Sequence, residues 1–217
     1  MNFFRLLYAT FLDSLFPLSG PEKELFSMSA EQAFEILPRA SKPPIEHAFS
    51  IFSYKDSRVT KLIWNIKYKK QKHAVAIGAF AIWKILAGSG FISGKRRCLI
   101  IPLPITEQRR RERGFNQCEL LTEELARLDK SRLFEIRKDL LQRVQHKSHQ
   151  TLKTRKERLK SAKGIFAVNE EVCPKELKWK ETIIIDDVIT TGSTMLEAME
   201  TLKKSGFENV KGLSLAH

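Results

Sequence analysis

The sequence has few of the residues that stabilise disulfide-rich or fibrous proteins. Its 217 residues include 3 cysteines and 10 glycines, which excludes a disulfide-stapled scaffold and a collagen-like repeat. The cysteines, Cys98, Cys118 and Cys173, form no CxxC pair and have no histidine at ligand spacing, so we expect no zinc site. Scattered thiols without a secretion signal predict a reducing compartment, the cytoplasm.

The sequence also lacks an apolar run long enough to span a membrane. The stretch from Met1 to Leu18 is apolar, but Arg5 and Asp13 interrupt it, and it falls short of the ~20 residues that a spanning helix needs. Within it, residues 3–15 carry an apolar residue at every fourth position, which predicts one face of a helix. We expect this face to pack on the body of the protein, with peripheral contact to a membrane surface or a partner protein as the alternative.

Acidic residues are scarce relative to basic ones, chiefly in one region. The chain has 38 Lys and Arg against 25 Asp and Glu, a net charge of +13, and residues 94–163 alone hold 20 against 9. A concentration of cations is typical of a protein that binds a polyanion, because each neutralised phosphate releases counterions. The alternative is a solvated face without a partner. The candidate contacts to nucleic acid or pyrophosphate are Arg109, Arg110, Arg111, Arg113, Lys153, Arg155 and Lys156.

The order of apolar segments predicts the fold class. Pro43 and Pro44 end an N-terminal segment, residues 1–44, and the main domain is expected at residues 45–217. Strands that alternate with helices predict an α/β fold, with a parallel sheet flanked by helices on both faces. Residues 145–161 are polar, basic and weakly periodic, which predicts a mobile loop. The expected strands are residues 47–54, 98–103, 165–168, 182–188 and 210–215, and the expected helices are residues 58–86 (one or two), 116–128, 133–144 and 193–204.

The most informative stretch begins with three isoleucines, residues 183–185, which fit a strand buried on both faces. Asp186 and Asp187 follow directly, and two neighbouring carboxylates are costly to bury. We therefore expect them to face the crevice at the carboxyl end of the sheet, where open α/β sheets bind ligands. Gly192 then permits an unusual backbone angle before a helix begins at Ser193 or Thr194.

This combination suits a sugar phosphate. Carboxylates accept hydrogen bonds from ribose hydroxyls, while free N–H groups at a helix N-terminus and the hydroxyls beside them hold a phosphate. The stretch is neither a Walker A loop nor a dinucleotide fingerprint, since GxxxxGK[ST] and GxGxxG are both absent. The candidate phosphate-binding residues are Thr190, Thr191, Gly192, Ser193 and Thr194.

Residues 183–194 resemble the phosphoribosyl pyrophosphate (PRPP) signature of type I phosphoribosyltransferases. The resemblance implies that Asp186 and Asp187 are the catalytic pair and bind the ribose hydroxyls, and that residues 190–194 bind the 5′-phosphate. It also implies a Mg²⁺ ion that arrives with PRPP and bridges its hydroxyls and pyrophosphate. Thr190 stands where hypoxanthine-type salvage enzymes carry an aspartate that exchanges a proton with the base, so that route is not supported here.

A second resemblance narrows the family. Residues 109–117, RRRERGFNQ, resemble the RxRGFNQ block of the ComF (ComFC/GntX-like) competence proteins, and residues 66–69 resemble that family's I-K-Y segment. The similarity keeps its order over residues 45–217. It implies a pyrophosphate loop at Leu103, Pro104 and Ile105 and a catalytic hood at residues 145–160. Many ComF proteins begin with a four-cysteine zinc module, but residues 1–44 hold no cysteine, so this segment is predicted to be a metal-free remnant or a replacement.

The resemblance predicts a PRPP-binding, phosphoribosyltransferase-like protein that acts on or binds single-stranded DNA in the cytoplasm during natural transformation, with DNA-translocation or competence proteins as partners. Two alternatives stay open: a nucleobase or orotate salvage phosphoribosyltransferase, and a non-catalytic PRPP-sensing module that binds DNA. His146 and His149 are expected at the surface rather than as acids. Trp179 is the better candidate for base stacking, with Trp64 and Trp83 expected in the core.

Overall fold

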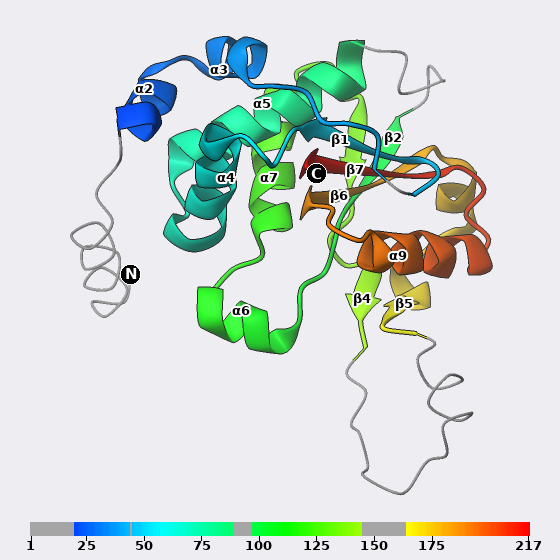
Figure 1. The fold of residues 1–217 in the computed structure, drawn as a ribbon. Coiled ribbons are helices and arrows are strands. Elements are labelled where there is room, and N and C mark those ends of the chain that lie inside the picture. Colours follow the sequence, from blue (N-terminus) through cyan, green and yellow to red (C-terminus); the bar gives the residue numbers. More distant parts are fainter. Residues whose placement is uncertain (1–19, 44, 89–96, 145–163) are drawn as a thin grey trace, which may run out of the picture.

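The computed structural model describes residues 20–43, 45–88, 97–144 and 164–217. Helices lie on both faces of its five-stranded sheet (Figure 1), which confirms the predicted α/β class. All neighbouring strands of this sheet are parallel. The strand order is β1 (Ala48–Phe52), β7 (Val210–Ala216), β6 (Thr182–Val188), β2 (Cys98–Pro102) and β3 (Phe134–Ile136).

Strand β6 lies in the middle of the sheet and divides the core into two clusters. Ile183 and Ile185 point to the face covered by α5 (Lys72–Gly88) and α7 (Gln117–Leu128). Ile184 points to the opposite face, which α9 (Ser193–Lys204) covers. Side chains of a strand alternate between its faces, and all three are fully buried, so the predicted two-sided burial is confirmed.

Two helices of the N-terminal segment pack on the first of these clusters. They are α2 (Gly20–Ser27) and α3 (Ala30–Ile36), and Ser29 caps α3 with a capping box. Phe34 of α3 meets Phe52 of β1 edge to face, with ring centroids 6.0 Å apart. The described part of the segment therefore shares the core of the main domain, while the boundary at residue 44 stays a prediction. The predicted apolar helix face at residues 3–15 lies outside the described residues.

The expected helical region at residues 58–86 contains two α-helices with a change of pitch between them. Helix α4 (Ser57–Trp64) continues into a π-helical turn, η1 (Asn65–Lys69), before α5 begins. Lys70 ends η1 in the left-handed conformation, with φ at 50°. Short π-helical segments are rare in proteins overall, and those that do occur are often found at functional sites.

The prediction of a helix at residues 133–144 is wrong. Residues 134–136 form the edge strand β3, parallel to β2, and β4 (Leu141–Arg143) pairs antiparallel with β5 (Phe166–Val168). Asp129 helps to start β3, because its carboxylate accepts the N–H groups of Leu133 and Phe134. The apolar residues of this stretch fit either period, and partners distant in sequence decided between them.

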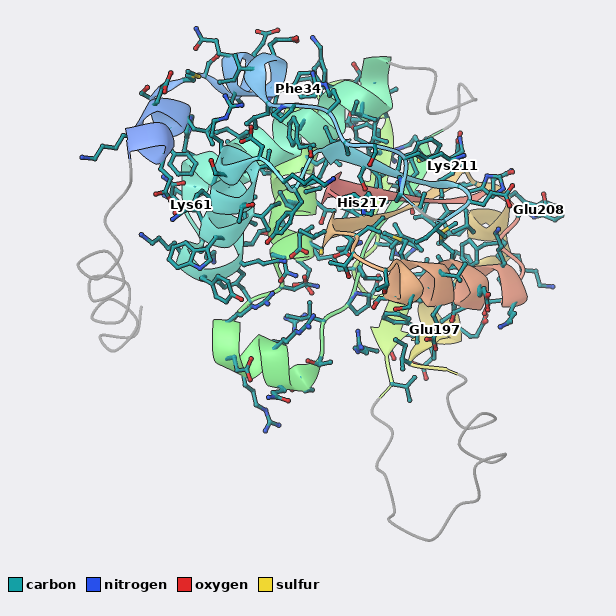
Figure 2. The ribbon with its side chains drawn as sticks, viewed as in Figure 1. Phe34, Lys61, Glu197, Glu208, Lys211 and His217 are labelled. Atoms are coloured by element: carbon teal, nitrogen blue, oxygen red, sulfur yellow. The ribbon has the colours of Figure 1, made fainter. Side chains whose placement is uncertain are left out.

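Both ends of the sheet are marked by labelled residues in Figure 2. His217 follows β7 at its carboxyl end, whereas Glu208 and Lys211 lie at the amino end of the same strand. Two short 3-10 helices, η2 (Glu170–Val172) and η3 (Lys175–Trp179), precede β6, so exposed Trp179 lies at the amino end of the sheet. Helix α6 (Glu107–Arg113) follows β2 at the carboxyl end. In the part of the chain that the structure describes, no helix combines the length and apolarity needed to cross a membrane.

Candidate active site

The loop between β6 and α9 has a fixed shape. The Ile189 N–H donates to the carbonyl of Ala216 (3.0 Å), and Nδ1 of His217 lies 2.9 Å from the Ile189 carbonyl. Gly192 has a φ of 82°, and a Cβ there would lie 2.0 Å from Cδ1 of Ile45. The position therefore requires glycine.

Helix α9 begins directly after Gly192, its N-cap residue. Within the described residues no side chain caps this end of the helix, so its first N–H groups are open to a ligand. Thr191 and Ser193 place their hydroxyls 3.2 Å apart beside it. The positive end of the helix dipole and these donors together make a site for a phosphate.

The two carboxylates after the isoleucines have different surroundings. Oδ1 of Asp186 accepts the N–H of Asp187 (2.8 Å) and the thiol of Cys118 (Sγ to Oδ1, 3.6 Å). Oδ1 of Asp187 lies 3.1 Å from Nζ of Lys67, which comes from the π-helical turn. Asp187 is 4% exposed and Asp186 is half-buried. The pair is thus held by a lysine and a thiol rather than by solvent.

One atom of this pair lacks a partner. Oδ2 of Asp187 is buried and accepts no hydrogen bond from the described residues. An unpaired buried carboxylate oxygen costs free energy, so such an atom is where a ligand hydroxyl or a bound water gains most. This arrangement suits a hydroxyl donor at the floor of the site.

Burial and charge both change the acidity of this cluster. Burial, followed by the negative charge of Asp187, raises the pKa of Asp186 to about 7. Burial, followed by the charges of the two carboxylates, raises the pKa of the Cys118 thiol. The cluster accordingly disfavours a second negative charge beside Asp187, and an incoming cation or hydrogen-bond donor would offset that cost.

The predicted elements come together in one cavity of about 560 Å³, a size suited to a small molecule. Asp186, Asp187 and residues 190–194 line one side, and residues 103–105 line the other. The Leu103 N–H donates to the carbonyl of Ile185 (2.9 Å), which ties the second loop to β6. The structure therefore places the three predicted groups around a shared space at the carboxyl end of the sheet.

The GFNQ block explains part of this arrangement. Asn116 caps α7, accepting the N–H of Cys118 (2.9 Å), and its Nδ2 donates to the carbonyl of Leu103 (3.1 Å). Gln117 accepts from Nη1 of Arg113 (3.0 Å) and also lines the cavity. This short block thus holds a loop, orients an arginine and brings a thiol to Asp186.

The four arginines of α6 point in different directions because consecutive helix residues lie on different faces. Arg109 and Arg113, four residues apart, share a helix face and both line the cavity. Arg110 instead pairs with Glu119 of α7, and Arg111 is exposed and lies 3.8 Å from Glu107. Only two of the four arginines therefore reach the site.

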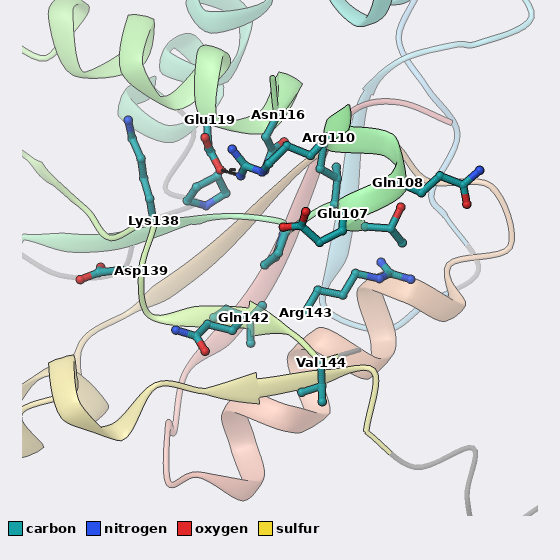
Figure 3. A pocket seen from close by; sticks show the side chains of 15 residues that line it. Glu107, Gln108, Arg110, Asn116, Glu119, Lys138, Asp139, Gln142, Arg143 and Val144 are labelled. Atoms are coloured by element: carbon teal, nitrogen blue, oxygen red, sulfur yellow. Dashed lines mark hydrogen bonds and ion pairs between the residues drawn. The ribbon is translucent and has the colours of Figure 1, made fainter. Parts of the chain in front are cut away.

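A second cavity, of about 510 Å³, adjoins the first (Figure 3), and the residues that line both are Pro104, Ile105, Thr106, Gln108 and Arg143. The Arg110–Glu119 pair lies on its wall, as the dashed line in Figure 3 marks. The rest of its wall includes polar side chains from α6, α7 and β4, and Lys138 and Asp139 from the loop before β4.

Sequence reasoning gave no role to two cations of the site. Lys67 lies within the I-K-Y segment, but three lysines follow one another closely there, and only the fold shows which one reaches Asp187. Arg143 comes from β4, a segment expected to be helical, and lines both cavities. Burial, followed by the charge of Arg109, lowers the pKa of Arg143.

Several candidates lie outside the described residues: Lys153, Arg155, Lys156, His146, His149 and the predicted hood at residues 145–160. Trp83 packs against the core as expected. Trp179 is 65% exposed, but at the opposite end of β6 from the cavity. Among the described residues, no cluster of three carboxylates, thiols or imidazoles could hold a metal ion by itself.

Comparison with known proteins agrees with this geometry. Residues 123–216 match a family described as "Phosphoribosyl transferase domain". The chain is 36% identical to "Competence protein F" of Haemophilus influenzae over 118 residues, which cover 54% of this chain and 49% of that protein. It is 29% identical to "Competence protein ComFC" of Streptococcus pneumoniae over 140 residues, 64% of this chain and 57% of that protein. It is 25% identical to "DNA utilization protein YhgH" of Escherichia coli O6:H1 over 170 residues, 78% and 71% of the two chains. The alignments thus span about half the length of the two competence proteins.

Proposed function

We propose a function for this chain from the premise that it belongs to the ComF family, a branch of the type I phosphoribosyltransferase superfamily. The proposal is that the cavity binds PRPP with Mg²⁺, and that the protein takes part in the handling of incoming single-stranded DNA. The observation that carries the first half is the shared cavity of the acidic pair, the hydroxyl loop and residues 103–105.

The ribose fits the acidic pair. Its vicinal hydroxyls are donors, and the buried Oδ2 of Asp187 is an acceptor that no described residue satisfies. Lys67 fixes the other oxygen of the same carboxylate, so the unpaired atom is held in place before the ligand arrives. The uncapped start of α9 is in position for the 5′-phosphate, because a phosphate accepts from several N–H groups at once.

The pyrophosphate fits the other side of the cavity. Arg109 and Arg113 are the cations beside the loop at residues 103–105, and guanidinium groups bind phosphate oxygens in a bidentate fashion. Opposite charge placed where a pyrophosphate leaves the sugar stabilises the developing negative charge. Arg143 adds a third cation on this side.

A Mg²⁺ ion fits the same donors as a companion of PRPP. Oxygen ligands suit this ion, which binds through one or two carboxylates and substrate phosphates rather than through an all-protein cage. Asp186 and Asp187 are the residues that would hold it, directly or through its water. When bound, the ion neutralises charge on the pyrophosphate as the bond to the ribose breaks.

The test is calorimetric titration of the full chain with Mg·PRPP. The variant Asp186→Asn with Asp187→Asn keeps the shape of both side chains and is expected to abolish binding while the circular dichroism spectrum stays unchanged. Glu200→Gln, on the exposed side of α9, serves as the control and should bind as the wild type does. Unchanged affinity of the double variant would refute the site.

The role with DNA is supported by the names of the relatives and by the basic region. The relatives are named for competence and DNA utilization, and cations are concentrated at residues 94–163. Three free, buried thiols, Cys98, Cys118 and Cys173, support the reducing cytoplasm as the place of action.

Pyrophosphate release from Mg·PRPP separates the three functions that the sequence leaves open. Release with single-stranded DNA supports transfer to DNA, and release with one free nucleobase supports a salvage enzyme. Binding of PRPP without release on any acceptor supports a non-catalytic module. Each assay includes Asp186→Asn with Asp187→Asn as the inactive reference.

A further inference from the structure

Three aromatic side chains, Trp64, Tyr68 and Phe115, come from segments next to Lys67 and Arg113, two residues that line the cavity. Trp64 ends α4, and Tyr68 follows four residues later on η1, with the two ring centroids 5.8 Å apart and tilted by 47°. Phe115 comes from the turn between α6 and α7. Tyr68 is 48% exposed, and the other two rings are partly exposed. Because these rings are partly exposed to solvent, packing in the hydrophobic core does not by itself explain their positions.

Each ring carries a cation. Nζ of Lys69 lies 5.2 Å from the centroid of the tryptophan ring, and Cζ of Arg113 lies 5.2 Å from the centroid of the tyrosine ring. Nζ of Lys70 lies 5.7 Å from the centroid of the phenylalanine ring. Lys70 and Arg113 form no ion pair with another described residue. Their charge is therefore available to an anion.

We propose that these six residues, here named the aromatic strip, bind single-stranded DNA. The inference rests on the proposed role with DNA and assigns that partner to a surface. Bases stack on aromatic faces and on guanidinium planes, while lysines meet the phosphates between them. A duplex keeps its bases stacked inside and offers only its backbone, so the rings favour a single strand. The residues of the aromatic strip are Trp64, Tyr68, Lys69, Lys70, Phe115 and Arg113.

The aromatic strip joins the proposed PRPP site. Arg113 belongs to both, since it lies over Tyr68 and lines the cavity. Lys67, which holds Asp187, directly precedes Tyr68 on η1. A strand on the aromatic strip therefore passes the mouth of the cavity, which brings a nucleotide next to the site of the ribose.

The experiment measures binding of a labelled 20-nucleotide oligothymidine to the full chain by fluorescence anisotropy. Tyr68→Ala is expected to weaken binding at least about fivefold, the effect of losing one base–aromatic stack. Tyr68→Phe keeps the ring and should bind as the wild type does. Tyr68 does not line the cavity, so both variants should still bind Mg·PRPP, and Tyr68→Phe, which keeps the ring beside Arg113, should do so with unchanged heat. Trp179→Ala removes a more exposed ring at the other end of the sheet and should change neither.

A second variant, Lys69→Gln, tests the contribution of charge. It keeps the proposal testable even where Tyr68→Ala does not fold. Lys69→Gln should lower the slope of log affinity against log salt by about one phosphate contact. Equal binding by Tyr68→Ala, Lys69→Gln and the wild type would overturn the proposal. It would also be overturned if the wild type bound no oligothymidine, or bound polyphosphate of equal charge or a duplex as tightly. Tighter binding of oligouridine would overturn the assignment to DNA. Failure of the PRPP proposal appears independently, as absence of Mg·PRPP heat in the wild type.

Discussion

The ion pair between Lys67 and Asp187 permits a quantitative test of the site. Its atoms lie 3.1 Å apart, and the two side chains are 20% and 6% exposed. Lys67→Met removes the cation, keeps most of the volume and leaves two carboxylates together. Because Lys67 also lowers the pKa of Asp186, that pKa should rise further in the variant. Removing one partner of a buried ion pair lowers the free energy of unfolding by about 3–5 kcal/mol. Because Lys67 is partly exposed, we expect Lys67→Met to lower it by about 2–4 kcal/mol.

A double-mutant cycle isolates the pair. Combining Lys67→Met with Asp187→Asn removes both charges, so the double variant should recover much of the loss, with a coupling energy of about 2 kcal/mol. The matched control is Lys204→Met with Glu200→Gln on α9, whose charged atoms are also 3.1 Å apart but whose side chains are 72% and 52% exposed. There we expect a coupling energy below about 0.5 kcal/mol.

The assay is urea unfolding at pH 8, followed by far-ultraviolet circular dichroism, for both cycles. If the free energy of unfolding falls no more in Lys67→Met than in Lys204→Met, the assignment of a buried, functional ion pair is wrong. Equal coupling energies in the two cycles would contradict it in the same way.

Two further predictions concern the same cavity. The pKa of Asp186 is raised from 3.8 to about 7 in the folded protein, so the folded state binds more protons between these values and the free energy of unfolding falls as pH rises from about 4 to about 7. Urea titrations should show the wild type losing about 1–4 kcal/mol over this range relative to Asp186→Asn, and parallel curves for the two would contradict the shift. Gly192→Ala forces a Cβ toward Ile45 at a positive φ and should cost about 1–3 kcal/mol by thermal unfolding, with weaker Mg·PRPP binding by calorimetry. An unchanged midpoint would show that the loop is not constrained as described.

The sequence predicted the elements of the fold best where its pattern of apolar and capping residues favoured one kind of element. Three consecutive isoleucines before two aspartates fit a strand buried on both faces, and β6 has that place in the sheet. The N-cap predicted at Asn116 also gave the correct start of α7. The helix predicted at residues 133–144 was wrong because the apolar spacing there fits both a helix and a strand. The pairing with β2 and β5 that makes these residues strands involves residues distant in sequence.

The candidate site was readable to the extent that its residues are neighbours in the chain. Arg109, Arg110, Arg111 and Arg113 were all predicted to contact nucleic acid or pyrophosphate, and Arg109 and Arg113 line the cavity. A helix turns consecutive residues by about 100°, so Arg110 and Arg111 point away from this cavity, and their contact with nucleic acid stays a prediction. Lys67, Cys118 and Arg143 come from three other elements, and nothing local distinguishes them from ordinary surface or core residues.

The amino-acid order by itself determined which segment holds the carboxylates and hydroxyls, because these residues are neighbours in the chain and the strand preference of isoleucine and the backbone freedom of Gly192 are local effects. Tertiary structure alone decided how those carboxylates are balanced. A lysine from the π-helical turn and a thiol from α7 reach them only after the parallel strands have assembled, since side chains that meet across a sheet edge come from elements far apart in the chain. The charge environment of the site is therefore a property of the packed domain rather than of any one segment.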